Sequence, residues 1–251
     1  IDVFNDYIVV VDPVRFGPPV GKVALFKVME KGTVLPVEQW KLEGVVEGEE
    51  LIGANRVQIK GSVAYIGGAY SSQGREEAGV DSGHMGVVDI FNPKKPEIIC
   101  DVPFSDIRGP VGLTIAGNIV FCAGGQSIDA FDISDPLKPI KLAGQSFEIY
   151  NKKANKPGNY HDLIYRDGYL YISAQADNGF LILKVDDSRI RKLADSVPNK
   201  LSISGVFPDL TGYTLREDVP FTRGNECGIG AIVPWAGKLY MINYGAHYPE
   251  G

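Results

Sequence analysis

The stretch from Val111 to Pro139, VGLTIAGNIVFCAGGQSIDAFDISDPLKP, contains three apolar runs, the first two joined at Gly117-Asn118 and the third closed by Asp135-Pro136. Short apolar runs separated by such turn residues predict three strands of a small antiparallel sheet. A sheet of this size cannot bury both of its faces alone, so a chain that repeats it must stack the copies face to face, as the blades of a propeller do. The stretch therefore predicts an all-β fold.

The hairpin of this stretch recurs along the chain. Aligned on it, the copies have their turns at Asp6, Gly61, Gly117, Gly168 and Gly237, which are 55, 56, 51 and 69 residues apart. Spacings of this size are typical of propeller blades. Each turn is followed two residues later by an apolar residue, namely Ile8, Val63, Ile119, Leu170 and Leu239. We predict a β-propeller with four full blades and an incomplete fifth, in one domain over residues 1–251.

A third strand follows the hairpin in four copies, and two of these strands lead into Pro93–Pro96 and Pro136–Pro139. Proline blocks further ladder pairing, so the chain should turn there into an outer fourth strand. The predicted blades cover residues 1–44, 52–104, 109–147, 160–200 and 226–251. Because the fifth copy has two strands, either the propeller has a short last blade or a further propeller segment completes a larger, seven-bladed ring.

The apolar register also predicts which side chains are buried. Phe121, Ile133 and Ile115 should lie between neighbouring blades. The chain has three cysteines and no Cys-x-x-Cys spacing, so the sequence gives no zinc signature. Cys100 and Cys122 fall in apolar strands and should be buried.

The charge balance excludes one class of partner. The chain has 25 basic and 31 acidic residues, a net charge of −6, and no basic run longer than Lys94-Lys95 or Lys152-Lys153. It therefore lacks the positive surface that a nucleic-acid backbone requires. No segment approaches the roughly 20 apolar residues of a membrane span, and no motif identifies a cofactor.

The pattern Gly-x followed by four apolar residues, and later by Asp-Ile-Ser-Asp-Pro-x-Lys-Pro, resembles the LVIVD repeat of bacterial and archaeal surface propellers. The resemblance covers about residues 1–200 and is strongest in the third blade. It implies a propeller that is secreted, periplasmic or on the cell surface. It implies no settled activity, and it favours a non-catalytic module that binds a glycan or a surface protein.

One face of the predicted disc should hold the site. The loops that lead into the innermost strands and those between second and third strands open there, and ligands usually bind on that face. The long connections sort onto it: residues 44–53, 105–110, 148–160 and 201–226 in the first set, and residues 12–21, 67–86 and 245–251 in the second. All three histidines also fall there: His84, His161 and His247.

Two interpretations of these histidines are open. A shared metal ion would need their rings to converge within bonding distance, whereas each can equally be a rim histidine bonded to a carbonyl. His161-Asp162, at the entrance to blade four, can bond structurally across the channel. We predict no metal ligands in this chain.

The tail carries a second resemblance. Gly228 to Trp235, with Tyr244, His247, Pro249 and Gly251, is similar to the first hairpin of propeller-type rhamnosidases and rhamnose-glucuronate lyases. The resemblance covers about a tenth of the chain and implies that His247 acts as general acid or base. In those enzymes the motif opens the domain, whereas here it lies at the end of the chain.

Two functions follow. The first is a secreted propeller of a polysaccharide-processing system that cleaves or binds a rhamnose- or uronate-containing glycan, as a glycoside hydrolase or polysaccharide lyase if catalytic. The second is a non-catalytic surface module for a protein or glycan. The predicted catalytic residues are His247, Tyr244 and His161. The predicted substrate-binding residues are Arg108, Arg223, Asp162, His84, Tyr160 and Glu226.

Overall fold

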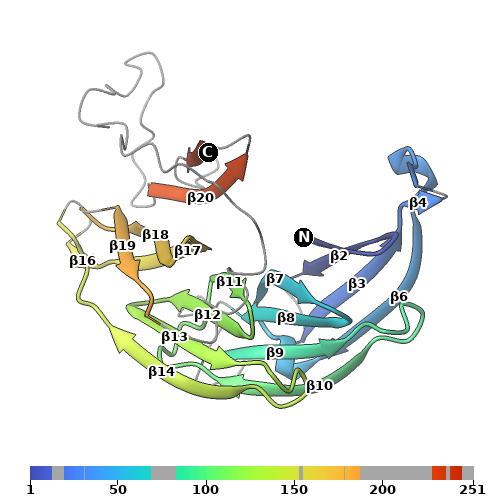
Figure 1. Cartoon of the computed structure of the whole chain (residues 1–251), viewed down its shortest axis with the longest axis horizontal. Coiled ribbons are helices and arrows are strands. Elements are labelled where there is room, and N and C mark those ends of the chain that lie inside the picture. Colours follow the sequence, from blue (N-terminus) through green and yellow to red (C-terminus); the bar gives the residue numbers. More distant parts are fainter. Residues whose placement is uncertain are drawn as a thin grey trace, which may run out of the picture.

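The computed structural model describes residues 1–12, 20–30, 32–68, 83–152, 155–177, 179–186, 228–235 and 238–244. Within these ranges the chain has no α-helix and forms antiparallel sheets, so the predicted all-β class is confirmed (Figure 1). Three sheets have four strands, the fourth has three and the fifth has two. The arrangement is that of propeller blades.

The strands follow each other in chain order within every main sheet. The first sheet contains β1 (Asp2–Phe4), β2 (Tyr7–Asp12), β3 (Gly21–Lys27) and β6 (Lys41–Gly48). The second contains β7 (Ala54–Lys60), β8 (Val63–Gly68), β9 (His84–Asp89) and β10 (Glu97–Pro103). The third contains β11 (Gly112–Ala116), β12 (Ile119–Gly124), β13 (Ser127–Asp132) and β14 (Ile140–Ser146). The fourth contains β17 (Asn159–Arg166), β18 (Tyr169–Gln175) and β19 (Phe180–Lys184), and the fifth contains β20 (Gly228–Trp235) and β21 (Lys238–Tyr244).

Smaller elements lie in the connections. Two short hairpins are β4 (Met29–Glu30) with β5 (Thr33–Val34), and β15 (Tyr150–Asn151) with β16 (Lys156–Pro157). Two single 3-10 turns are η1 (Val37–Gln39) and η2 (Glu49–Leu51).

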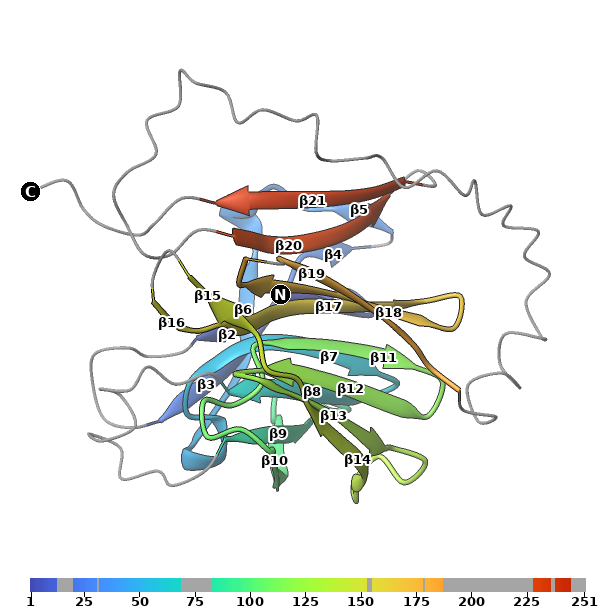
Figure 2. The same ribbon diagram turned by 90° about the vertical axis from the view of Figure 1, so that its left-hand side faces the viewer.

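The sheets stack on one another in an arc, with β7, β11 and β17 toward its middle (Figures 1 and 2). Strand β7 contacts β1, β2 and β11, and β17 contacts β11 and β20, so successive sheets are neighbours. Side chains also link the inner strands to each other. Asp2 accepts a hydrogen bond from the Ile59 backbone (2.7 Å), and Thr114 accepts one from the Tyr165 backbone (3.2 Å).

The hairpin turns occur where the repeat predicted them, but the alignment needs a correction of one residue. Each turn has two residues, and the first of them has a positive φ in the described turns: Asn5, Gly61, Gly117 and Asp167. The predicted turn residues Asp6 and Gly168 therefore occupy the second position, one later than Gly61 and Gly117. A one-residue slip moves every side chain to the other face of the sheet. Gly237 lies outside the described residues.

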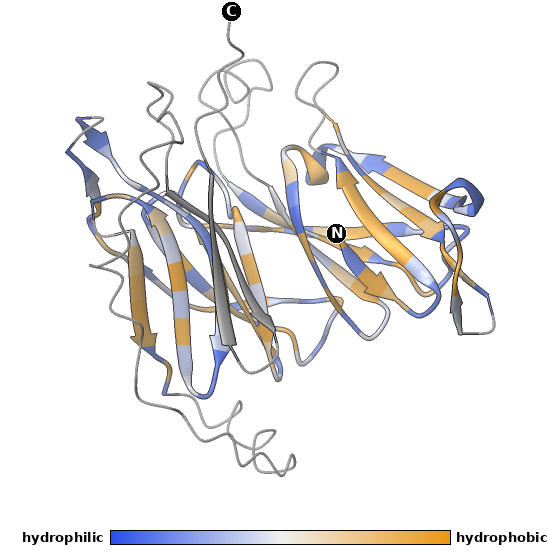
Figure 3. Ribbon diagram, turned by 90° about the horizontal axis from the view of Figure 1, so that it is seen from above, coloured by the Kyte–Doolittle hydropathy of each residue, from blue (hydrophilic) through white to orange (hydrophobic). Residues whose placement is uncertain are grey.

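Three apolar clusters fill the spaces between the first four sheets. Figure 3 shows apolar residues along the strands of these sheets. Phe121 and Ile133 are buried as predicted, Phe121 between the third and fourth sheets and Ile133 between the second and third. The prediction for Ile115 is wrong in part: it is only half-buried and packs against the margin of the cluster between the second and third sheets. Cys122 is fully buried, and Cys100, on the outer strand β10, is half-buried.

The Asp-Pro motif has a physical role that goes beyond the proline. The Asp132 side chain accepts a hydrogen bond from the Ser134 backbone (2.8 Å), and Asp135 accepts one from the Leu137 backbone (3.1 Å). Asp89 and Asn92 make the equivalent contacts in the second sheet. Two successive side-chain-capped turns thus lead the chain into β14 and into β10. The first sheet lacks this motif, and its fourth strand, β6, covers part of the loop predicted over residues 44–53.

Candidate functional site

Two of the innermost strands, β7 and β17, are joined near their starting ends, past the intervening strand β11. The Arg56 guanidinium on β7 lies 2.6 Å from Asp162 Oδ2 on β17, and Asp162 Oδ1 accepts a hydrogen bond from the Leu163 backbone (2.9 Å). Both carboxylate oxygens of Asp162 are therefore engaged, and the side chain is almost fully buried. Asp162 thus bonds to another innermost strand and has a structural role, whereas its predicted role in substrate binding stays a prediction.

Strand β11 lies between β7 and β17, and its sequence explains how Arg56 and Asp162 can meet. In the corrected alignment, Arg56, Gly112 and Asp162 occupy the same position in successive sheets. A Cβ on Gly112 would lie 2.8 Å from the Asp162 Cα, so glycine is required for β11 to pass this close to β17. Arg56 was not predicted from the sequence, although the corrected repeat pairs its position with that of Asp162.

His161 lies in a β-bulge. The pairing of β17 with β18 shifts between Tyr160 and Asp162, so His161 has no residue opposite it. The same bulge recurs in β7 at Asn55 and in β20 at Gly230. The bulge is therefore a property of the repeat. His161 is half-buried, and a bulge can re-aim such a side chain beside a functional site.

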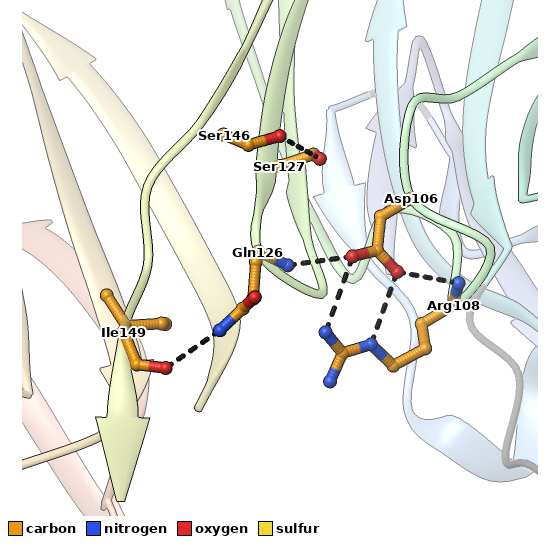
Figure 4. Close-up of polar contacts among 6 residues, drawn as sticks. All are labelled: Asp106, Arg108, Gln126, Ser127, Ser146 and Ile149. Carbon is orange, nitrogen blue, oxygen red and sulfur yellow. Dashed lines mark hydrogen bonds and ion pairs between the residues drawn. The ribbon is translucent and has the colours of Figure 1, made fainter. Parts of the chain in front are cut away.

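Arg108 belongs to a polar cluster at the same end of the sheets (Figure 4). Its Nε lies 3.2 Å from Asp106 Oδ1, and the Asp106 carboxylate also accepts hydrogen bonds from the Gln126 and Arg108 backbones (2.9 Å each). The Gln126 side chain donates in turn to the Ile149 carbonyl (2.8 Å). The cluster ties the turn between β12 and β13 to the connections on either side of the third sheet.

The Asp106 carboxylate is held in its charged form. Burial by itself would raise the pKa of Asp106, but the hydrogen bonds from the Arg108 side chain and from the Gln126 and Arg108 backbones lower it below the ordinary value. The carboxylate also fills the space beside Gly125, where a Cβ would lie about 2 Å from it. Asp106 is thus a structural anchor, and a hollow of about 340 Å³ lies beside it, lined by Ser105 to Arg108.

His84 is the first residue of β9 and is buried. Burial lowers its pKa, although the charges of Asp101 and Glu50 and a hydrogen bond with the Glu50 backbone act in the opposite direction. The imidazole is therefore neutral near pH 7. His84 and His161 both lie at the end of the sheets where β7, β11 and β17 begin, as predicted.

We expect His84 to make stability depend on pH. Its folded pKa is lowered from an unfolded value of about 6.5, so its contribution is present above that pH and is lost as the pH falls. His84→Gln should therefore lose less stability than the wild type when urea unfolding is compared at pH 7 and pH 5. Equal losses in the two proteins would contradict this assignment.

A groove of about 580 Å³ lies at the same end, between the third and fourth sheets. It is lined by Phe147, Glu148, Ile149, Tyr160, Ala174, Gly179, Phe180 and Leu181. Tyr160 is fully buried, and its hydroxyl has no hydrogen-bond partner among the described residues. Burial raises the pKa of this hydroxyl to about 12, so it stays protonated and can donate a hydrogen bond.

The backbone holds Tyr160 firmly beside this groove. Its N–H donates to the Gly125 carbonyl (2.8 Å), which bridges β17 to the end of the third sheet. A buried hydroxyl without a partner costs free energy, so such a group is a specific feature that needs an explanation. Tyr160 is one of the residues that line the groove, so a ligand hydroxyl or carboxylate bound there is the candidate for the missing acceptor.

The remaining predicted residues are in the last part of the chain. Arg223, Glu226 and His247 lie outside the described residues. Tyr244 is the last residue of β21, and its backbone pairs with Gly228 at the start of β20. Within the described ranges, no three histidine, cysteine or acidic side chains cluster as metal ligands would. No helix among the described residues has the length and apolar character to cross a membrane.

Comparisons with known proteins give only distant similarities. Neither protein-family models nor curated proteins match the sequence. Solved structures that are similar include a functionally unknown protein from Desulfotomaculum acetoxidans, at 12% identity and a TM-score of 0.37 over 74% of this chain and 64% of that one. Others are a hypothetical selenium-binding protein from Sulfolobus tokodaii, at 15% and 0.43 over 68% and 50%, and a chain of the COPII outer coat vertex on membranes, at 11% and 0.44 over 71% and 43%.

This chain spans less than two thirds of the length of each of these proteins. At such identities and TM-scores the similarities carry no argument about activity or partners.

Proposed function

We propose that this chain is a secreted β-propeller that binds a glycan in the groove beside Tyr160. Two observations carry the proposal: Tyr160 lines a groove of about 580 Å³, and its buried hydroxyl has no hydrogen-bond partner among the described residues. The groove has the size of known small-molecule sites, about 300–1,000 Å³. A sugar would offer both an apolar ring face and hydroxyl acceptors to it.

The side chains around the hydroxyl suit a sugar. Phe147 and Phe180 provide aromatic surface, and Glu148 provides acceptors for sugar hydroxyls. Rings of this kind bury large apolar areas while a polar tip fixes the orientation of the ligand. The resemblances described above favour a rhamnose- or uronate-containing glycan.

The ion-paired carboxylates Asp106 and Asp162 favour binding over cleavage. Cleavage of a glycan by two carboxyl groups needs one that can give up a proton and one that faces the bond. Asp106 and Asp162 are instead ion-paired with Arg108 and Arg56. Their charges serve to hold the connections and the inner strands in place.

Tyr160→Phe tests this site by separating binding from stability. The substitution removes an unpartnered hydroxyl, so the free energy of unfolding should stay constant or rise, whereas glycan affinity should fall about tenfold because one hydrogen bond is lost. Calorimetric titration with rhamnose- and uronate-containing oligosaccharides would measure the affinity. Tyr169→Phe, at the far end of β18, is the matched control and should leave binding unchanged. A weakened fold with unchanged binding would refute the assignment.

Cleavage is the second candidate, and the end of β21 favours it. Tyr244 pairs with Gly228, so the strand ends on the face where the innermost strands begin, and His247 follows three residues later. If His247 is the general acid or base, His247→Ala should lower turnover by about a hundredfold or more at an unchanged melting temperature. New reducing ends and the ultraviolet absorbance of unsaturated uronates would report hydrolysis and elimination. Glycan binding by the wild type without either product would leave the binding function alone.

A further inference from the structure

The first sheet has an apolar face that no other described sheet covers. Strand pairing aligns its residues in two rows, one of Val3, Ile8, Phe26 and Leu42 and one of Val10, Ala24 and Val45. Residues directly opposite each other in an antiparallel sheet point to the same side, so these seven residues form one surface, which we call the open face. None of the seven is buried, and Val3, Leu42 and Val45 are 58%, 55% and 41% exposed.

The other side of the same sheet is packed in the ordinary way. Val9, Val23 and Leu25 alternate with the open-face residues and are fully buried against the second sheet. None of the open-face residues belongs to the three apolar clusters of the described chain. Figure 1 shows that the arc of sheets is open between the first sheet and β20.

The repeat shows what the open face is built for. In the corrected alignment, Ile8, Val10 and Phe26 correspond to Ala64, Ile66 and Val88 of the second sheet, which are buried against the first sheet. The corresponding residues of the third and fourth sheets, such as Val120 and Leu170, are buried against the sheet that precedes them. Each of these sheets thus offers the same positions to its predecessor.

The composition of the open face excludes a role as a solvent-facing cap. Stacked repeats that end in water need a polar outer face on the last unit. Here the polar residues are confined to the next row, Asp12, Lys22 and Glu47, in which Lys22 and Glu47 form an ion pair (2.9 Å). The apolar rows stop at this charged border, as they would at the rim of an interface between blades.

We propose that the open face is an interface for a further propeller blade, a four-stranded antiparallel sheet that presents alternating aliphatic residues. The interface would continue the series of contacts that joins the first four sheets. This surface is separate from the Tyr160 groove, so the inference does not depend on the proposed function.

The test uses an engineered chain in which a second copy of the first blade is added before residue 1. In the corrected alignment, residue 1 of the first sheet is equivalent to residue 57 of the second. One full repeat is therefore 56 residues long, and a copy of residues 1–56 is joined directly before Ile1. Val10→Cys in the original first sheet reports on the open face, and maleimide labelling is followed by mass spectrometry of its peptide. We expect labelling to slow at least about tenfold in the extended chain, because the thiol would then react only after local opening. Ile140→Cys, on the exposed strand β14, is the control and should label at the same rate in both chains.

Two outcomes would overturn the proposal. One is equal labelling of Val10→Cys in the folded extended and unextended chains. The other is protection in the unextended chain that grows with protein concentration and accompanies a dimer in sedimentation, since a second copy would then cover the face.

A pair of variants in the unextended chain keeps the test independent of whether the extended chain folds. Val10→Lys should lower the melting temperature by less than about 4 °C, because its ammonium group can reach water. Ile66→Lys, at the equivalent buried position, should prevent folding. Equal damage by the two lysines would show that the open face is already covered and would refute the proposal.

Discussion

Phe121→Ala will lower the free energy of unfolding by about 3–5 kcal/mol, the range for truncating a buried aromatic side chain in a packed core. Phe121 is 6% exposed and lies in the cluster between the third and fourth sheets. Its ring stacks on that of Tyr165, with centroids 6.2 Å apart, so the substitution removes contacts to both sheets. Denaturant unfolding followed by circular dichroism would measure the loss.

Phe91→Ala is the matched control for this prediction. Phe91 is 77% exposed in the turn after β9, so its truncation should change stability by no more than about 0.5 kcal/mol. A loss below about 1 kcal/mol for Phe121→Ala would mean that the third and fourth sheets do not pack through this residue.

The hairpins could be predicted because they are local. A turn residue followed by an apolar run specifies two adjacent strands, and β12, β8 and β18 lie where this signal placed them. The register of the turns was harder to predict. Asp6 and Gly168 are turn-forming residues like Gly61, but they occupy the second turn position and Gly61 occupies the first. Only the strand pairing, which involves residues on both sides of the turn, shows the difference.

Elements without a local signal were missed. Strand β6 of the first sheet has no Asp-Pro turn before it, so part of it was assigned to a loop. The prolines that precede β10 and β14 did give such a signal, and both strands exist. A fourth strand is otherwise defined by its pairing with the third, which a single strand's composition does not specify.

The sequence predicted at which end of the sheets the site residues lie, but not which residues they contact. His84, His161 and Asp162 lie at the expected end of the sheets, because the strand order alone decides at which end a residue falls. The partners Arg56 and Asp106 come from other sheets and from a connection. Such contacts depend on how neighbouring sheets stack, which a repeat period does not give.

The contact between Arg56 and Asp162 provides the second large effect. Asp162→Ala should cost about 3 kcal/mol, because removing one partner of a buried ion pair leaves the other charge uncompensated. The value stands at the low end of the usual range, since the Arg56 side chain is 32% exposed and can be partly rehydrated. Thermal and denaturant unfolding would measure it.

A double-mutant cycle separates this ion pair from packing effects. Arg56→Met keeps most of the side-chain volume, and in its presence Asp162→Ala should cost much less, giving a coupling energy above about 1 kcal/mol. Lys95 and Glu97 form an exposed ion pair (2.6 Å) that serves as the matched control, with an expected coupling of about 0–1 kcal/mol. If the coupling between Arg56 and Asp162 does not exceed that of the control, the contact does not hold β7 and β17 together across β11. The inner strands would then be positioned by the apolar clusters between the sheets alone.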